Sequence, residues 1–174
     1  MAEQKTQWER AADIVKDAGG RIVGRTRLQK IAYLLQLAGV GDGFSFDYKH
    51  YGPYSEELAA AISSAEAFGL VVEEEKLTSW GGWYSIYSAG SVVRGTDIVA
   101  RHALAHEAIK IGAIELELAA TAAYLHAVEG CSDPWGETAR LKPEKASLER
   151  MSKAKTAYEK LRKIDTPSPL PELF

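Results

Sequence analysis

The sequence is poor in cysteine, because Cys131 is the single one among its 174 residues. No disulfide can therefore form within the chain, and nothing in its composition indicates an oxidising compartment. The sequence also lacks the run of roughly 18 or more apolar residues that a membrane-spanning helix needs. Its first residues, MAEQKTQWER, contain no apolar signal-peptide core. These absences predict a cytoplasmic protein that does not use a membrane.

A strong charge of either sign is lacking as well. The formal net charge is −3, with 21 Lys and Arg against 24 Asp and Glu, so the chain as a whole does not attract nucleic acid or anionic lipid. A hydrophobic content of 46% and a charged content of 26% are ordinary for a globular protein that buries a core of its own. Binding of nucleic acid would therefore require a local basic patch.

Hydrophobic periodicity and turn residues predict a mainly helical, α+β chain. The expected elements are helices at 6–18 and 26–38, a strand at 44–48, a helix after Ser55 and a hairpin around Gly81 and Gly82. Helix, helix, strand, helix and hairpin follow one another in this order in a winged helix-turn-helix domain, with the hairpin as its small wing. We therefore expect residues 6–92 to form a winged-helix-like domain.

Local signals predict where two of these helices begin. Thr26 is followed three residues later by Gln29, which is the spacing of a capping box. Ser55 is a good N-cap, and Glu56 and Glu57 follow it where the helix dipole favours negative charge. In front of Ser55, Pro53 disfavours the helical region for the preceding residue, so the Gly-Pro pair is expected to stop a strand before the helix starts.

The second half of the sequence reads as a helical extension at 93–165, packed on the first domain. A helical pattern runs from Thr96 and is expected to break near Gly112. The breaker-rich stretch 131–143 predicts a loop, and Pro143 suits the first turn of a last helix. With three prolines among its residues, the tail 166–174 is expected to be extended.

Two stretches carry a resemblance to a known family. RTRLQKIAYLLQ and FSFDYKHYGPYSEELAAAI resemble the Panacea domain, an antitoxin and proteolytic-adaptor family, and most of all its uncharacterised bacterial and archaeal members with Leu-Gln-Lys and Tyr-Gly-Pro-Tyr-Ser motifs. In the helical remainder, ELAATAAYL and ARLKPEK resemble the same group. The resemblance implies a non-catalytic protein without a cofactor, which binds a protein partner such as a toxin or a protease client.

Aromatic residues around the Tyr-Gly-Pro-Tyr-Ser motif form one candidate partner-binding edge. Tyrosine and tryptophan anchor many protein interfaces, and strand, turn and wing neighbour one another in a winged helix. The candidate edge comprises Tyr48, His50, Tyr51, Gly52, Pro53, Tyr54, Trp80 and Trp83. The alternative is that most of these aromatic side chains fill the core and that the Gly-Pro pair is only a folding device.

A DNA-binding regulator is the second functional hypothesis. The expected recognition helix is unsuited to DNA, because the stretch from Pro53 to Glu75 contains six glutamates and no Lys or Arg, whereas contact with phosphates needs cations. The candidate patch for nucleic acid or an acidic partner is instead Arg21, Arg25, Arg27 and Lys30, with Lys49 and His50 as a candidate continuation. A solvated start of a helix is the alternative explanation of this patch.

Enzymatic chemistry has little support in the sequence. His102 and His106 lie four residues apart and would share one face of a helix, but no third metal ligand follows at a recognisable spacing. Cys131, beside Ser132 and Asp133, has no base at a diagnostic distance along the chain. We therefore expect two surface histidines, a structural or incidental thiol, and neither a metal site nor a catalytic centre. A metal-dependent enzyme centred on His102 and His106 is the third and remotest hypothesis.

Overall fold

The fold was analysed in a computed structural model, which describes residues 3–49 and 51–174. Helices make up about half of the chain, in agreement with the predicted helix-rich α+β class. They are α1 (Gln7–Asp17), α2 (Arg25–Leu37), α3 (Glu56–Ala67), α4 (Val99–Ala108), α5 (Ala113–Ala127), α6 (Pro134–Leu141) and α7 (Leu148–Arg162). In this part of the chain, no helix has both the length and the apolar character to cross a membrane.

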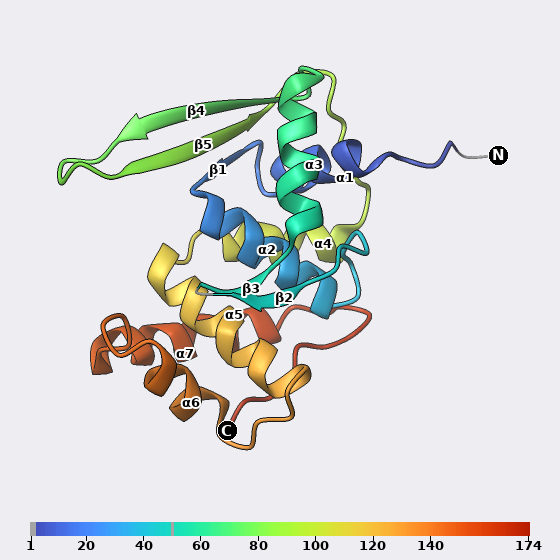
Figure 1. The fold of residues 1–174 in the computed structure, drawn as a ribbon. Helices are drawn as coiled ribbons and strands as arrows, with labels where there is room; N and C mark the ends of the chain where they lie inside the picture. Colours follow the sequence, from blue (N-terminus) through green and yellow to red (C-terminus); the bar gives the residue numbers. More distant parts are fainter. Residues whose placement is uncertain (1–2, 50) are drawn as a thin grey trace.

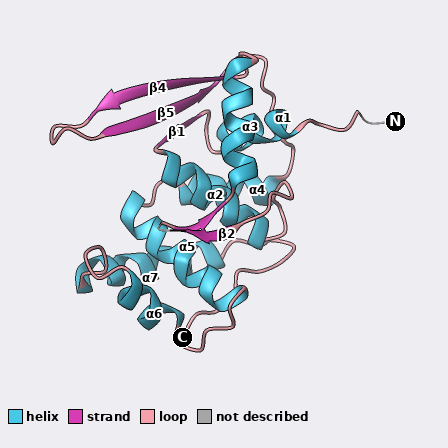
Figure 2. Cartoon of the chain, viewed as in Figure 1, coloured by secondary structure: helices cyan, strands magenta, loops and turns pink. Residues whose placement is uncertain are grey.

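The strands form two separate antiparallel sheets. Strands β1 (Arg21–Val23), β5 (Trp83–Ala89) and β4 (Val71–Leu77) lie in this order in one sheet, and β2 (Asp47–Lys49) pairs with β3 (Gly52–Tyr54) in the other. In Figure 1 the β4–β5 hairpin, here called the wing, projects from the top of α3 away from the helical body. The β2–β3 ribbon lies lower, beside α2 and α5 (Figure 2).

Helix α3 begins and ends as the sequence predicts. The Ser55 hydroxyl accepts a hydrogen bond from the Leu58 amide, and the acids Glu56 and Glu57 occupy the first turn. At the other end, Gly69 takes a φ of +76° and the amide of Leu70 donates to the carbonyl of Ala65, which is the Schellman pattern of helix termination. These two caps fix where the wing starts, because β4 follows directly.

The predicted start of α2 was wrong in its mechanism. Its N-cap is Gly24, which has a φ of +101° and provides no side-chain cap. Gln29 does not form a capping box with Thr26, because its amide group is buried and bonded to Ser55. The predicted strand 44–48 is also shorter and shifted, since only Asp47–Lys49 pairs with β3.

Two expectations for the second half require correction. Residues 131–143 are not a plain loop, because Asp133 accepts a hydrogen bond from the Gly136 amide and begins α6 with Pro134 in its first turn. Helix α7 starts at Leu148 under a Ser147 cap and not at Pro143. The break before α5 at Gly112 is confirmed.

One hydrophobic core runs through both predicted segments. It includes Ile14 and Leu34 from the first segment and Leu104 and Leu118 from the second. The tail takes part as well: Leu170 is buried, and the Tyr158 hydroxyl donates to the carbonyl of Pro171 at 2.6 Å. The tail is thus extended, as expected, but packed.

A buried arginine ties the two segments together. Arg101 of α4 is 1% exposed, and its guanidinium contacts Asp17 at 2.7 Å and Asp42 at 2.9 Å. Burial raises the pKa of Asp42, although Arg101 opposes this shift. Because both carboxylates lie within residues 6–92, Arg101 fixes α4 against the first segment.

Removal of this arginine should strongly destabilise the fold. We expect Arg101→Ala to lower the free energy of unfolding by roughly 3–5 kcal/mol, because it leaves two carboxylates without their buried partner. Lys110→Ala, which breaks an exposed pair with Glu107, is the control and should leave the free energy of unfolding nearly unchanged. Urea denaturation measures both; equal effects would contradict a structural role for Arg101.

Candidate partner-binding site

Two side chains of the Leu-Gln-Lys motif in α2 form hydrogen bonds with the backbone at Pro53 and Ser55. The Gln29 side chain accepts a hydrogen bond from the Ser55 amide at 2.8 Å and donates one to the Ser55 carbonyl at 3.0 Å. Next to it, the Lys30 ammonium donates to the carbonyl of Pro53 at 2.7 Å. The two motifs quoted from the sequence are therefore in contact, side chain to backbone, inside the protein.

Helix α5 closes on the same turn. Gly52 has a φ of +89°, and a Cβ atom at this position would lie only 2.3 Å from the Thr121 hydroxyl oxygen. Glycine is required here both for its left-handed backbone and for the close approach of the helix. The Thr121 hydroxyl is buried and has no hydrogen-bond partner among the described residues.

The buried Glu117 contacts two lysines of the motif ARLKPEK. Glu117 of α5 is 2% exposed, with Lys145 at 2.9 Å and Lys142 at 3.8 Å. The ammonium of Lys145 also lies 4.6 Å from the centre of the Tyr51 ring. All four quoted motifs meet in this motif cluster, which comprises Gln29, Lys30, Gly52, Pro53, Ser55, Glu117, Thr121, Lys142 and Lys145.

The electrostatics of the cluster are unusual. Burial lowers the pKa of Lys30 to about 7, Lys142 and Lys145 act in the same direction, and Glu117 opposes them. Burial also lowers the pKa of Lys142. Lys30 and Thr121 are 0% exposed, whereas the Lys145 side chain is 27% exposed. The buried part of the cluster positions the ribbon against α2 and α5.

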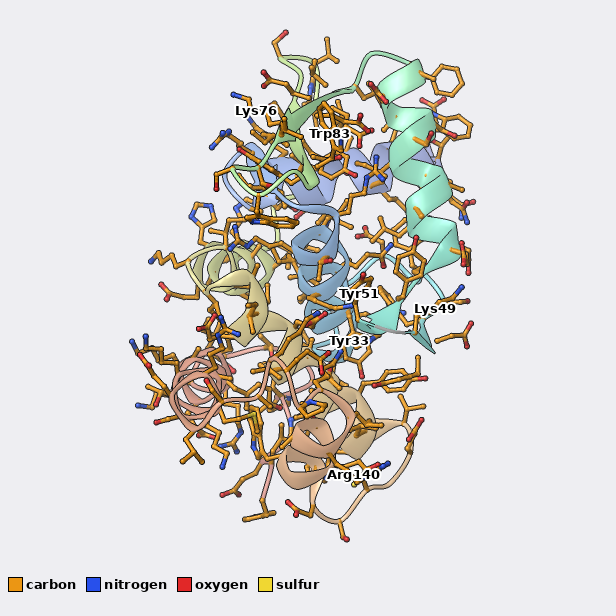
Figure 3. All side chains as sticks on the ribbon, turned by 60° about the vertical axis from the view of Figure 1, so that its left-hand side comes forward. Tyr33, Lys49, Tyr51, Lys76, Trp83 and Arg140 are labelled. Atoms are coloured by element: carbon orange, nitrogen blue, oxygen red, sulfur yellow. The ribbon has the colours of Figure 1, made fainter. Side chains whose placement is uncertain are left out.

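The predicted binding-edge residues fall into two groups. Tyr51 of the ribbon is 53% exposed, whereas Trp80 and Trp83 at the wing tip are 80% and 69% exposed. Figure 3 shows Trp83 well separated from Tyr51, because ribbon and wing belong to different sheets. The structure therefore places these aromatic side chains on two surfaces and not on one edge.

The other members of the predicted edge are less accessible. Tyr48 is half-buried against Tyr124, with ring centres 6.1 Å apart. Gly52 and Pro53 are buried, and Tyr54 is half-buried. His50 lies outside the described residues. The core interpretation therefore holds for part of the ribbon, but not for the wing tip.

The four cations of the predicted basic patch do not form a continuous surface. Lys30 is buried, and its ammonium donates a hydrogen bond to the Pro53 carbonyl. Arg25 pairs with Glu73 and Glu75, each at 3.0 Å. Arg27 donates to the Ile111 carbonyl at 3.1 Å, and Arg21 remains exposed on β1. Including Lys30 in a surface patch was therefore wrong.

The two histidines of α4 have different surroundings. The Nε2 atom of His102 lies 3.0 Å from Asp17 and also contacts the Thr96 carbonyl, whereas His106 is exposed. Within residues 3–49 and 51–174, no three His, Cys, Asp or Glu side chains lie together as a metal-binding group. Cys131 is half-buried.

Sequence reasoning missed Glu117, Thr121, Lys142 and Lys145 as a group. The available signal was the pair Glu115 and Glu117 inside the mostly apolar stretch AIELELAATAAYLHA, since a buried charge needs a partner. That signal shows neither which glutamate is buried nor its partner, because Lys145 follows Glu117 by 28 residues, after α6. Only the folded arrangement brings them together.

Comparison with known proteins gives limited further information. No family model matches the chain. The uncharacterised protein YwgA of Bacillus subtilis (strain 168) is 35% identical over 74 residues, which correspond to 41% of this chain and 45% of that protein. The match thus spans less than half of that relative. The resemblance to the Panacea domain stays a prediction.

The pKa of Lys30 makes stability depend on pH. The folded-state pKa is about 7 and the ordinary value is 10.5, so the unfolded chain binds more protons between these values and stability rises with pH there. We expect the stability of the wild type relative to Lys30→Met to increase by roughly 1–3 kcal/mol between about pH 6 and about pH 9. Urea denaturation at both pH values measures it; a constant difference would disprove the shifted pKa.

The close approach at Gly52 can be tested by a double-mutant cycle. Gly52→Ala should lower the free energy of unfolding by roughly 1–3 kcal/mol, and Thr121→Ala should recover part of this loss by removing the hydroxyl oxygen. Gly43→Ala is the control, since Gly43 has a φ of +80° and no neighbour within 4 Å. It should show the backbone effect alone; additive effects of Gly52→Ala and Thr121→Ala would refute the contact.

Proposed function

We propose that this chain is a non-catalytic protein-interaction module of winged-helix architecture, which contacts its partner through the wing tip. The observation that carries the proposal is the exposure of Trp80 and Trp83, at 80% and 69%, on a projecting hairpin. Leu77, which lies opposite Trp83 in the β4–β5 register, is 58% exposed. Three large apolar side chains thus face solvent at one place.

Such a tip is suited to protein recognition. Tryptophan is strongly enriched among the residues that dominate binding energy at interfaces. An exposed apolar cluster that is rimmed by charge is typical of an interaction site, and the wing provides the rim with Glu74, Glu75 and Lys76. The order of α1, α2, α3 and the β4–β5 hairpin supports the winged-helix assignment.

Contact with DNA through the same surface is disfavoured. Helix α3, in the place of the recognition helix, carries Glu56, Glu57 and Glu66 and no cation. Of the alternative basic patch, Lys30 is buried and Arg25 is paired with acids. Since DNA affinity depends on several cationic contacts with phosphates, these residues favour a protein partner.

The resemblance to the Panacea domain suggests the kind of partner. An antitoxin would bind a toxin, and a proteolytic adaptor would bind a client that it brings to a protease. Both roles need a binding surface and no catalytic centre. We propose that the protein acts in this way in the cytoplasm.

The proposal predicts a partner whose capture depends on the wing tip. In a pull-down of the tagged chain from its own cells after nuclease treatment, Trp80→Ala with Trp83→Ala should reduce one stoichiometric protein by at least about tenfold. Leu148→Ala is the matched control, because Leu148 is 93% exposed on α7. Undiminished capture, or recovery of DNA without a protein before nuclease treatment, would contradict the proposal.

A further inference from the structure

A groove lies between α3 and the wing. It has a volume of about 260 Å³. Its lining residues are Arg25, Leu28 and Gln29 from α2, Tyr54 from the ribbon, Ala59, Ile62 and Ser63 from α3, and Glu73 and Tyr87 from the wing. Small side chains of α3 leave this groove open, while aromatic and aliphatic side chains form its walls.

Acidic side chains border the groove on two sides. On α3, Glu56 and Glu66 continue the helical row of Ala59 and Ser63, since residues three or four apart share a face. On the wing, Glu73 and Glu75 occupy alternate positions of β4 and therefore the same face. This face is the one turned to α2, because Arg25 pairs with both glutamates.

Cations compensate only part of this charge. Arg25 serves Glu73 and Glu75, and Lys49 pairs with Glu56. Within the described part of the chain, no cation pairs with Glu66. The Glu75 side chain remains 58% exposed in spite of its pair. The border of the groove is thus left with an excess of negative charge.

Arg25 shows what kind of group suits this place. Its guanidinium donates to Glu73 from both Nε and Nη2, at 3.3 and 3.0 Å, and from Nη2 to Glu75 at 3.0 Å. Glu73 also accepts from the Ser85 hydroxyl at 2.7 Å. Burial opposes the ionisation of Glu73, but the hydrogen bonds from Ser85 and Arg25 hold its pKa below the ordinary value. The wing therefore presents an ionised carboxylate beside the groove.

We infer that the groove between α3 and the wing receives an arginine or lysine side chain from a basic segment of the partner protein. The aliphatic stem would lie against Leu28 and Ile62, and the cation beside the ring of Tyr54, where it would share the Glu73 carboxylate with Arg25, which also lines the groove. The inference rests on the proposed protein-binding function and adds the chemistry of the partner. A basic segment complements the glutamates that border the groove, whereas an acidic segment would meet repulsion.

A basic peptide tests the groove directly. The probe is an acetylated, amidated pentapeptide with two arginines separated by glycine, titrated into the ¹⁵N-labelled 174-residue chain. We expect saturable shifts of amide resonances concentrated at Tyr54, Ser63 and Tyr87. Ser63→Arg places a cation in the groove from an exposed helical position and should weaken binding at least about tenfold. Ser152→Arg, on an exposed position of α7, should bind as the wild type does.

Several results would overturn the inference. Shifts centred elsewhere, the absence of saturable shifts, equal binding by Ser63→Arg, or the same shifts with a glutamate-containing peptide would each do so. The outcome is separate from the test of the wing tip. If the peptide binds in the groove but capture of the cellular partner does not depend on Trp80 and Trp83, only the proposed function is refuted. If capture depends on Trp80 and Trp83 but the peptide does not bind in the groove, only the inference about the groove is refuted.

Discussion

The buried hydrogen bond from the Lys30 ammonium to the Pro53 carbonyl is the constraint on which the binding side of the molecule depends. It holds the ribbon on α2, and Gln29 beside it fixes Ser55. Ser55 in turn caps α3, whose far end sets the start of the wing. The position of the exposed tryptophans thus depends, through the ribbon, Ser55 and α3, on contacts made by the buried Lys30 and its neighbour Gln29. Because a buried ammonium is costly unless it is hydrogen-bonded and paired, Lys30 depends on the Pro53 carbonyl and on the charge of Glu117.

Sequence patterns predicted the elements whose signals are local. The Ser55 cap, the glycine at the end of α3, and the Gly81-Gly82 hairpin depend on residues a few positions apart, and they are present. Prediction failed where a side chain has a distant use: Gln29 matches a capping box but bonds to Ser55, 26 residues away. Helix α6 was missed because its Asp133 cap and Pro134 resemble loop residues when no tertiary context is known.

The quoted motifs and the candidate binding surfaces are largely different residues. The motifs meet in a largely buried cluster around Glu117 and Lys30, where they fix the ribbon. The exposed wing tip carries Trp80 and Trp83, which belong to none of those motifs. A resemblance carried by such motifs therefore speaks for a shared fold, whereas the surface that we propose for the partner consists of wing residues outside these motifs. This distinction explains why the aromatic residues of the ribbon and the wing could not be separated by sequence alone.

The most direct test of this account is photo-crosslinking in living cells, with a photoreactive amino acid placed at position 83 or, as a reference, at position 148. Both positions are exposed, and they lie on the wing and on α7. The account predicts one discrete protein adduct from position 83 and none from position 148. Adducts from position 148 alone, or a crosslink from position 83 to nucleic acid instead of protein, would contradict it.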